Sequence, residues 1–86
     1  MRGVRLEPDA LEHLSQWLKQ DPKTLKRILR MFDECARNPF DGIGKPEPLK
    51  GNLRGKWSRR IDDEHRLVYD VTETEITIYS LWGHYD

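Results

Sequence analysis

Apolar residues in the N-terminal half of the chain recur with the period of an α-helix. A first run consists of Leu11, Leu14, Leu18 and the adjacent Trp17. A second run, the strongest periodic signal in the sequence, consists of Leu25, Ile28, Leu29, Phe32, Cys35 and Ala36. Pro8 suits the first position of one helix, and Asp21-Pro22 is typical of an N-cap and first turn. Asn38-Pro39 ends the second helix, so the sequence predicts two consecutive helices that form a hairpin.

In the C-terminal half, the period of the apolar residues changes to two, which indicates β-strands. We expect strands at Lys56–Ile61, His65–Val71 and Glu75–Trp82, and a short first strand at Val4–Leu6. Residues 39–55 carry three of the five prolines and four of the six glycines, so they are expected to form a loop. The order β-α-α-β-β-β predicts an α+β domain, in which an antiparallel β-sheet packs the two N-terminal helices on one face.

A three-residue turn at residues 62–64 sets the register of the first hairpin. The facing pairs are then Trp57–Tyr69, Arg60–Arg66 and Ile61–His65. The core face consists of Trp57, Ile61, Leu67, Tyr69 and Val71. A slip by one residue would pair Arg60 with Leu67 and mix the two faces. Arg59 falls on the core face, which indicates an edge, a bulge or a different register.

The predicted register places Arg60 and Arg66 opposite each other on the face away from the core. Like charges that face each other directly cost stability. Two planar guanidinium groups in this arrangement are suited to hold a phosphate. The alternative is that both side chains extend into water and pair with Asp62, Asp63 or Asp70.

Charge is unevenly distributed along a chain whose formal net charge is zero. Between residues 45 and 60, Glu47 is the one carboxylate, held between Pro46 and Pro48. The six cationic residues around it are Lys45, Lys50, Arg54, Lys56, Arg59 and Arg60. A locally basic surface on a neutral protein suits short-range contact with phosphates. The length of 86 residues predicts one domain, residues 1–86.

Several kinds of chemistry are disfavoured by the sequence. Cys35 is the one cysteine, so it forms no intramolecular disulfide and no zinc site, and in the apolar run it is expected to be a core residue. No spacing matches a metal site, a phosphate-binding glycine loop or a Ser-His-Asp triad, so no cofactor is expected. No apolar run approaches ~20 residues and no signal peptide is evident, so a cytoplasmic protein is expected.

The remaining candidates fit metal-free cleavage of RNA. A carboxylate such as Glu47 can take the proton of a 2′-hydroxyl, arginines can stabilise the phosphorane-like transition state, and His84 can protonate the leaving 5′-oxygen. The reaction would yield a 2′,3′-cyclic phosphate and would exclude DNA. Tyr85 offers a flat face for an unstacked base. His13 and His65 are expected to be structural or solvated, and a histidine near a chain end is itself usually solvated.

Three segments and the C-terminus carry a family resemblance. The segments are Asn38–Leu53, Trp57–Ile61 and Glu64–Tyr69, followed by the terminal Gly83-His84-Tyr85. This pattern resembles the YoeB/Txe branch of the RelE/ParE toxin superfamily. The resemblance implies a type II toxin–antitoxin mRNA interferase with a microbial-RNase-like fold, which cuts mRNA in the ribosomal A site. It also implies a homodimer and a YefM-like antitoxin whose C-terminal segment wraps the toxin.

The resemblance also implies roles for individual residues. Glu47 matches the family's general base, His84 its general acid, and Arg66 the arginine that stabilises the transition state. Lys50 and Arg60 match basic residues around the scissile phosphate, and Tyr85 matches the terminal tyrosine near the substrate base. The family pattern ends at that tyrosine, whereas Asp86 follows here. An added carboxylate beside His84 is expected to raise its pKa or to repel phosphate.

Two other readings keep the fold and change the activity. One is a ParE-like or catalytically inert homologue that acts by binding a protein partner, and the other is a passive RNA-binding module. A pure binder needs no carboxylate, opposed arginines and terminal histidine together. Their joint presence therefore favours the endoribonuclease.

Overall fold

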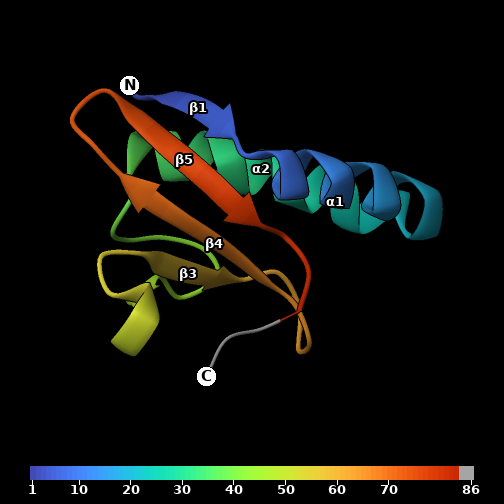
Figure 1. Ribbon diagram of the computed structural model, residues 1–86. Helices are drawn as coiled ribbons and strands as arrows, with labels where there is room; N and C mark the ends of the chain where they lie inside the picture. Colours follow the sequence, from blue (N-terminus) through green and yellow to red (C-terminus); the bar gives the residue numbers. More distant parts are fainter. Residues whose placement is uncertain (84–86) are drawn as a thin grey trace.

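The computed structural model describes residues 1–83, and its elements follow the predicted order (Figure 1). The helices are α1 (Pro8–Gln20) and α2 (Pro22–Arg37), with a short 3-10 helix, η1, at Gly51–Leu53. The strands are β1 (Gly3–Leu6), β2 (Glu47–Pro48), β3 (Trp57–Arg60), β4 (Arg66–Val71) and β5 (Glu75–Ser80). They form a sheet in the order β1-β5-β4-β3-β2, and both helices pack on one of its faces. The predicted α+β fold is confirmed.

The sheet is mixed, because β1 pairs in parallel with β5 while the other neighbouring strands are antiparallel. The prediction of an antiparallel sheet therefore holds for β2 to β5 and not for the β1 edge. Parallel neighbours cannot be joined by a tight turn. Here both helices and three strands separate β1 from β5 along the chain.

The predicted register of the first hairpin is confirmed. Strands β3 and β4 pair Trp57 with Tyr69 and Arg60 with Arg66. Beyond β3, the N–H of Ile61 donates to the carbonyl of His65 at 2.9 Å. The alternation of faces follows, so Leu67 and Tyr69 are fully buried against the helices.

The expectation of a loop over residues 39–55 is wrong at two places. Glu47 and Pro48 form the edge strand β2, which pairs with Ser58 and Trp57, and residues 51–53 form η1. A strand of two residues has no periodicity that a sequence can reveal, and its prolines are typical of a sheet edge. The segment is therefore more ordered than its proline and glycine content predicts.

Helix α1 turns Leu14 and Trp17 of the predicted run to the core, but not Leu11 and Leu18. Ala10 and Trp17 are its buried residues, whereas Leu11 and Leu18 are 60% and 59% exposed. The orientation is fixed by the indole of Trp17, which donates to the carbonyl of Leu81 at 2.8 Å. Within the part of the chain that the structure describes, no helix is long and apolar enough to span a bilayer.

Arg59 lies on the core face opposite Leu67, in the predicted register, and is fully buried. The charged residue on the apolar face of β3 is therefore a buried ion and does not indicate a wrong register. All five N–H donors of its guanidinium are matched by acceptors. These are the carboxylate of Glu34, the hydroxyl of Tyr69 and the carbonyls of Asn38, Asp41 and Ile43.

Burial in the core raises the pKa values of two side chains next to Arg59. Burial raises the pKa of the Cys35 thiol to about 11, and burial raises the pKa of the Tyr69 hydroxyl to about 12. Both groups stay protonated at neutral pH. Cys35 is thus a core residue, as predicted, and an unreactive thiol.

We expect Arg59→Met to lower the free energy of unfolding by about 3–5 kcal/mol, because Glu34 and the other acceptors lose their partner. Urea unfolding measures the change. The control is Arg37→Met, which breaks the exposed pair of Arg37 with Asp33 and should cost less than about 1 kcal/mol. Equal unfolding midpoints for the two variants would contradict a structural role for Arg59.

Candidate functional site

The face of the sheet away from the helices carries three of the candidate residues, Glu47, Arg60 and Arg66. Cross-strand pairing places Glu47 beside Ser58, and Ser58 beside Val68, in one row that shares a face. The opposed pair Arg60–Arg66 lies two residues along the same strands, so its side chains point to the same face. Strand spacing puts the Cα atoms of Glu47 and Arg66 about 12 Å apart, which two long side chains can bridge.

The two arginines differ in their surroundings. Arg60 is exposed, whereas Arg66 is half-buried, and Nη1 of Arg66 is buried with no hydrogen-bond partner among residues 1–83. The alternative that both pair with nearby acids is not seen in this part of the chain. Asp62 accepts the backbone N–H groups of its own turn, and Asp70 accepts from the hydroxyl of Tyr79.

Glu47 reaches this face because the loop before it is docked on β3. The N–H of Arg60 donates to the carbonyl of Gly44 at 2.7 Å. Gly44 has a φ of 79°, and a Cβ there would lie 2.8 Å from the carbonyl oxygen of Arg60. Glycine is therefore required for both conformation and space. Lys50 follows Glu47 in the chain, immediately precedes η1 and is exposed.

The predicted residues His84, Tyr85 and Asp86 lie outside the described residues. The described chain ends beside Arg66, whose N–H donates to the carbonyl of Gly83 at 2.8 Å. The N–H of Gly83 in turn donates to Nδ1 of His65 at 2.9 Å. Of the two roles expected for His65, structural or solvated, the structure shows the first: its hydrogen-bond partner is Gly83.

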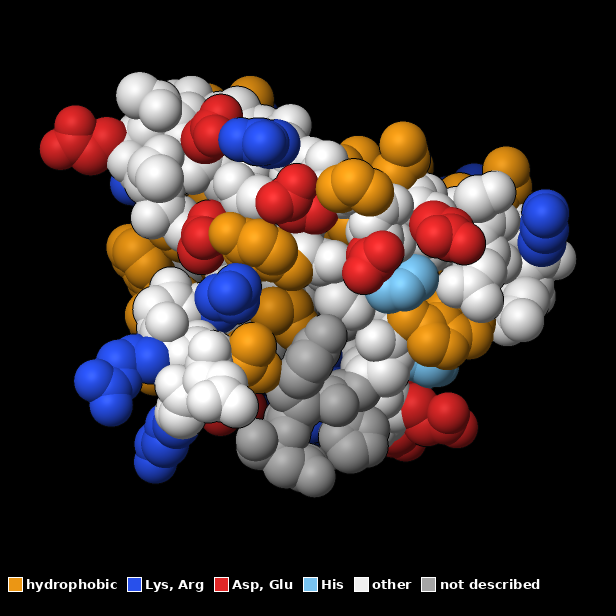
Figure 2. Space-filling model, viewed as in Figure 1, with side chains coloured by type: hydrophobic (Ala, Val, Ile, Leu, Met, Phe, Trp, Pro, Cys, Tyr) orange, Lys and Arg blue, Asp and Glu red, His pale blue; other side chains and the backbone are white. Residues whose placement is uncertain are grey.

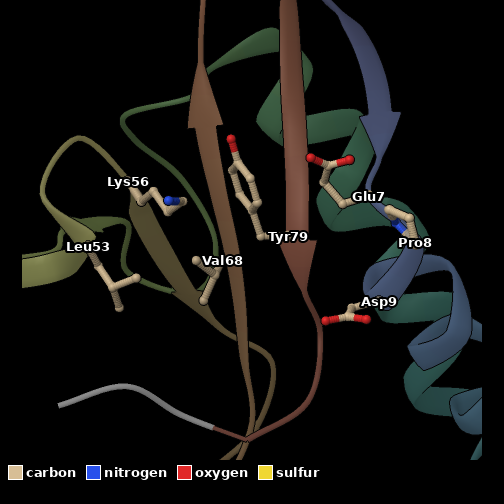
Figure 3. A pocket seen from close by; sticks show the side chains of 7 residues that line it. All are labelled: Glu7, Pro8, Asp9, Leu53, Lys56, Val68 and Tyr79. Atoms are coloured by element: carbon tan, nitrogen blue, oxygen red, sulfur yellow. The ribbon is translucent and has the colours of Figure 1, made fainter.

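A pocket of about 420 Å³ borders the row that contains Glu47 (Figure 3). Its lining residues are Glu7, Pro8, Asp9, Leu53, Lys56, Val68 and Tyr79. The hydroxyl of Tyr79 donates to Asp70 at 2.5 Å, and this bond raises the pKa of Tyr79 to about 12. Nζ of Lys56 lies 4.6 Å from the centroid of the Tyr79 ring. The sequence does not reveal this pocket, because the residues that line it come from distant segments of the chain.

Charge on this side of the molecule is segregated. Figure 2 shows Lys and Arg side chains projecting at the lower left, where β3 and η1 lie in Figure 1, and carboxylates gathered over β5 and α1. A polyanion on this surface is therefore attracted to the β3 side and repelled from the β5 side.

Comparisons with known proteins agree with this architecture. The structure of a YoeB dimer from Staphylococcus aureus superposes with a TM-score of 0.89 at 42% identity, covering 98% of each chain. A YoeB–YefM complex from the same species gives a TM-score of 0.87 at 41% identity, covering 99% of each chain. The fold is therefore that of the YoeB-type toxins.

The sequence gives the same result at the level of the family. The model of the YoeB-like toxins of bacterial type II toxin-antitoxin systems matches residues 6–85. Toxin YoeB of Mycobacterium bovis is 55% identical over 85 residues, which cover 99% of this chain and 100% of the relative. The chain belongs to the YoeB-like toxin family of bacterial type II toxin-antitoxin systems.

The role of Gly44 can be tested with a matched glycine. We expect Gly44→Ala to destabilise the fold more than Gly51→Ala. Both glycines have positive φ, but within residues 1–83 no atom lies within 4 Å of a Cβ at Gly51. The backbone strain is thus similar, about 1 kcal/mol or more in each variant, and the clash with Arg60 is added at Gly44 alone. Urea unfolding compares them, and an equal loss would show that the docking of the loop on β3 does not matter.

Proposed function

We propose that this toxin is a metal-free endoribonuclease that cuts mRNA in the A site of the bacterial 70S ribosome. Glu47 acts as the general base, Arg66 stabilises the transition state, and His84 acts as the general acid. Lys50 and Arg60 bind phosphate around the scissile linkage, and Tyr85 contacts the adjacent base. The family membership and the arrangement of Glu47, Arg60 and Arg66 on one open face support this proposal.

The observation that carries the proposal is Nη1 of Arg66, which is buried and has no hydrogen-bond partner among residues 1–83. A buried N–H without a partner costs about 1–3 kcal/mol, so a bound acceptor that satisfies it is favoured by a similar amount. Arg66 faces exposed Arg60 across β3 and β4, two residues along the strands from the row that contains Glu47. A phosphate that bridges Arg60 and Arg66 would supply the missing acceptor and bring its ribose toward the carboxylate.

The proposed reaction uses these residues as follows. Glu47 removes the proton of the 2′-hydroxyl, and the 2′-oxygen forms a bond to phosphorus. Negative charge then grows on the phosphorane oxygens, where guanidinium donors are most effective because they are fixed before the reaction. His84 gives a proton to the 5′-oxygen as its bond to phosphorus breaks. The products are a 2′,3′-cyclic phosphate and a free 5′-hydroxyl.

Partners follow from the relatives. Because the similar structures are a YoeB dimer and a YoeB–YefM complex, we infer that this chain forms a homodimer and is held inactive by a YefM-like antitoxin. The exposed Leu11 and Leu18 of α1 provide apolar surface for such contacts. An acidic antitoxin segment would compete with RNA for Arg60 and Arg66.

We expect Glu47→Gln, Arg66→Ala and His84→Ala each to lower the rate of mRNA cleavage on programmed ribosomes. Loss of the general base or acid should cost about 10²–10⁴-fold. Expression of each variant without antitoxin should no longer arrest bacterial growth. The control is Glu73→Gln, an exposed carboxylate in the β4–β5 turn, which should cleave as the wild type does. A wild-type protein that arrests growth while mRNA stays intact would favour the ParE-like reading.

We expect the pocket beside Val68 to hold the base of the nucleotide next to the scissile phosphate. Lys56, which lines the pocket, would then contact the phosphate of that nucleotide. Lys56→Met should weaken the binding of single-stranded RNA and lower the slope of log K against log salt by about 0.7, because one phosphate contact is lost. Fluorescence anisotropy at several salt concentrations measures the slope. The matched control is Lys19→Met at the far end of α1. An unchanged slope for Lys56→Met would place the phosphate elsewhere.

A further inference from the structure

Two histidines that the proposed reaction does not use both hold the backbone just before the C-terminus. Nδ1 of His13 accepts the N–H of Leu81 at 3.0 Å, and Nδ1 of His65 accepts the N–H of Gly83 at 2.9 Å. The two carbonyls are bound as well, by the indole of Trp17 at Leu81 and by the N–H of Arg66 at Gly83. Residues 81–83 lie beyond the end of β5, yet four hydrogen bonds fix them.

The imidazole of His65 is held in place by aromatic rings. Its centroid lies 4.5 Å from that of Trp82 and 5.0 Å from that of Trp17, with the latter pair edge to face. Trp17 and Trp82 are themselves 4.7 Å apart. The His65 side chain is 14% exposed. The ring therefore has little freedom to turn, and its Nδ1 is aimed at Gly83.

The hydrogen bond to Gly83 defines the protonation of His65. An imidazole nitrogen accepts an N–H only when it carries no proton itself. Nδ1 must be bare, so the ring is neutral and its proton is assigned to Nε2 from the network. Nε2 lies 3.8 Å from a carboxylate oxygen of Glu64, which suits a proton on that nitrogen.

Gly83 is the position at which such a restraint matters most. Its φ is 76°, and no atom of the described neighbours lies within 4 Å of the place that a Cβ would occupy. A glycine in open space has wide conformational freedom, so its backbone direction has to be set by its partners. The next residue in the sequence is His84, the proposed general acid.

We propose that His65 is a positioning residue for His84, acting through Gly83. This inference rests on the proposed function. The neutral imidazole fixes the N–H of Gly83 while the N–H of Arg66 fixes its carbonyl. These two bonds join Arg66, which is proposed to stabilise the transition state, to the residue that precedes His84, the proposed general acid. A displacement of about 1 Å in such an arrangement can cost about 100-fold in rate.

Two substitutions separate positioning from simple packing. His65→Phe keeps a flat ring between Trp17 and Trp82 but removes the acceptor. His65→Asn keeps an acceptor close to the place of Nδ1 but removes the ring. Positioning predicts that the phenylalanine variant loses about 10- to 100-fold in kcat with KM within about twofold of wild type. It also predicts that the asparagine variant, although less stable, retains more of its kcat.

Steady-state cleavage on programmed ribosomes gives kcat and KM, and urea unfolding shows that each variant is folded. The matched control is His13→Phe, which loses an acceptor for Leu81, two residues further from His84, and should lose less kcat than His65→Phe. A wild-type kcat in His65→Phe would overturn the proposal. So would a folded His65→Asn that is slower than His65→Phe, because packing alone would then explain the effect.

An NMR measurement separates this inference from the proposed function. In the wild type, the ¹⁵N shifts of His65 should report a neutral ring protonated at Nε2, and the Gly83 amide should be protected from exchange. In His65→Phe, the Gly83 amide should exchange at least about tenfold faster, since its acceptor is gone. A wild type that cleaves no RNA would refute the proposed function, whereas an unprotected Gly83 amide would refute the restraint itself.

Discussion

The buried guanidinium of Arg59 is the interaction on which the rest of this structure depends. A charge taken out of water is stable only when its donors are matched, and here the acceptors come from α2, β4 and the loop that follows α2. The carbonyls of Asn38, Asp41 and Ile43 bend that loop around a single side chain. The next step of the loop is Gly44, which docks on Arg60, and the chain then enters β2 with Glu47 on the open face. The position of the proposed base thus follows from the satisfaction of a buried cation.

Adjacent residues of β3 show how the period of a strand separates folding from chemistry. Arg59 points into the core and has all its donors matched, whereas Arg60 points to the open face and is exposed. The two side chains are identical, and the alternation of a strand alone directs Arg59 to the core and Arg60 to the opposite face. The same alternation on β4 buries Leu67 and leaves Arg66, one residue earlier, facing Arg60.

Local patterns in the sequence predict the elements, and contacts distant in sequence determine the rest. The apolar runs and the Asp21 cap predict both helices, and the turn at residues 62–64 fixes the register of β3 and β4, including the misfit of Arg59. The face that α1 buries, the parallel pairing of β1 and the edge strand β2 depend on partners elsewhere in the chain. The contacts of His65 could not be predicted from the sequence for the same reason, because its partners Trp17 and Gly83 come from α1 and from the segment after β5.

Carboxylates also define the site, although they bind no phosphate. Glu7 and Asp9 border the pocket, and Asp70 holds the hydroxyl of Tyr79, so the β5 side of the open face is acidic. The phosphates of the proposed RNA substrate would be repelled from that side and attracted to Arg60 and Arg66, whereas the donor-bearing edge of a base would be accepted there. A neutral protein can therefore select an orientation for a polyanion without long-range steering. The zero net charge of the chain thus combines a basic side and an acidic side of one face, and the proposed RNA strand would cross the sheet with its phosphates on the basic side.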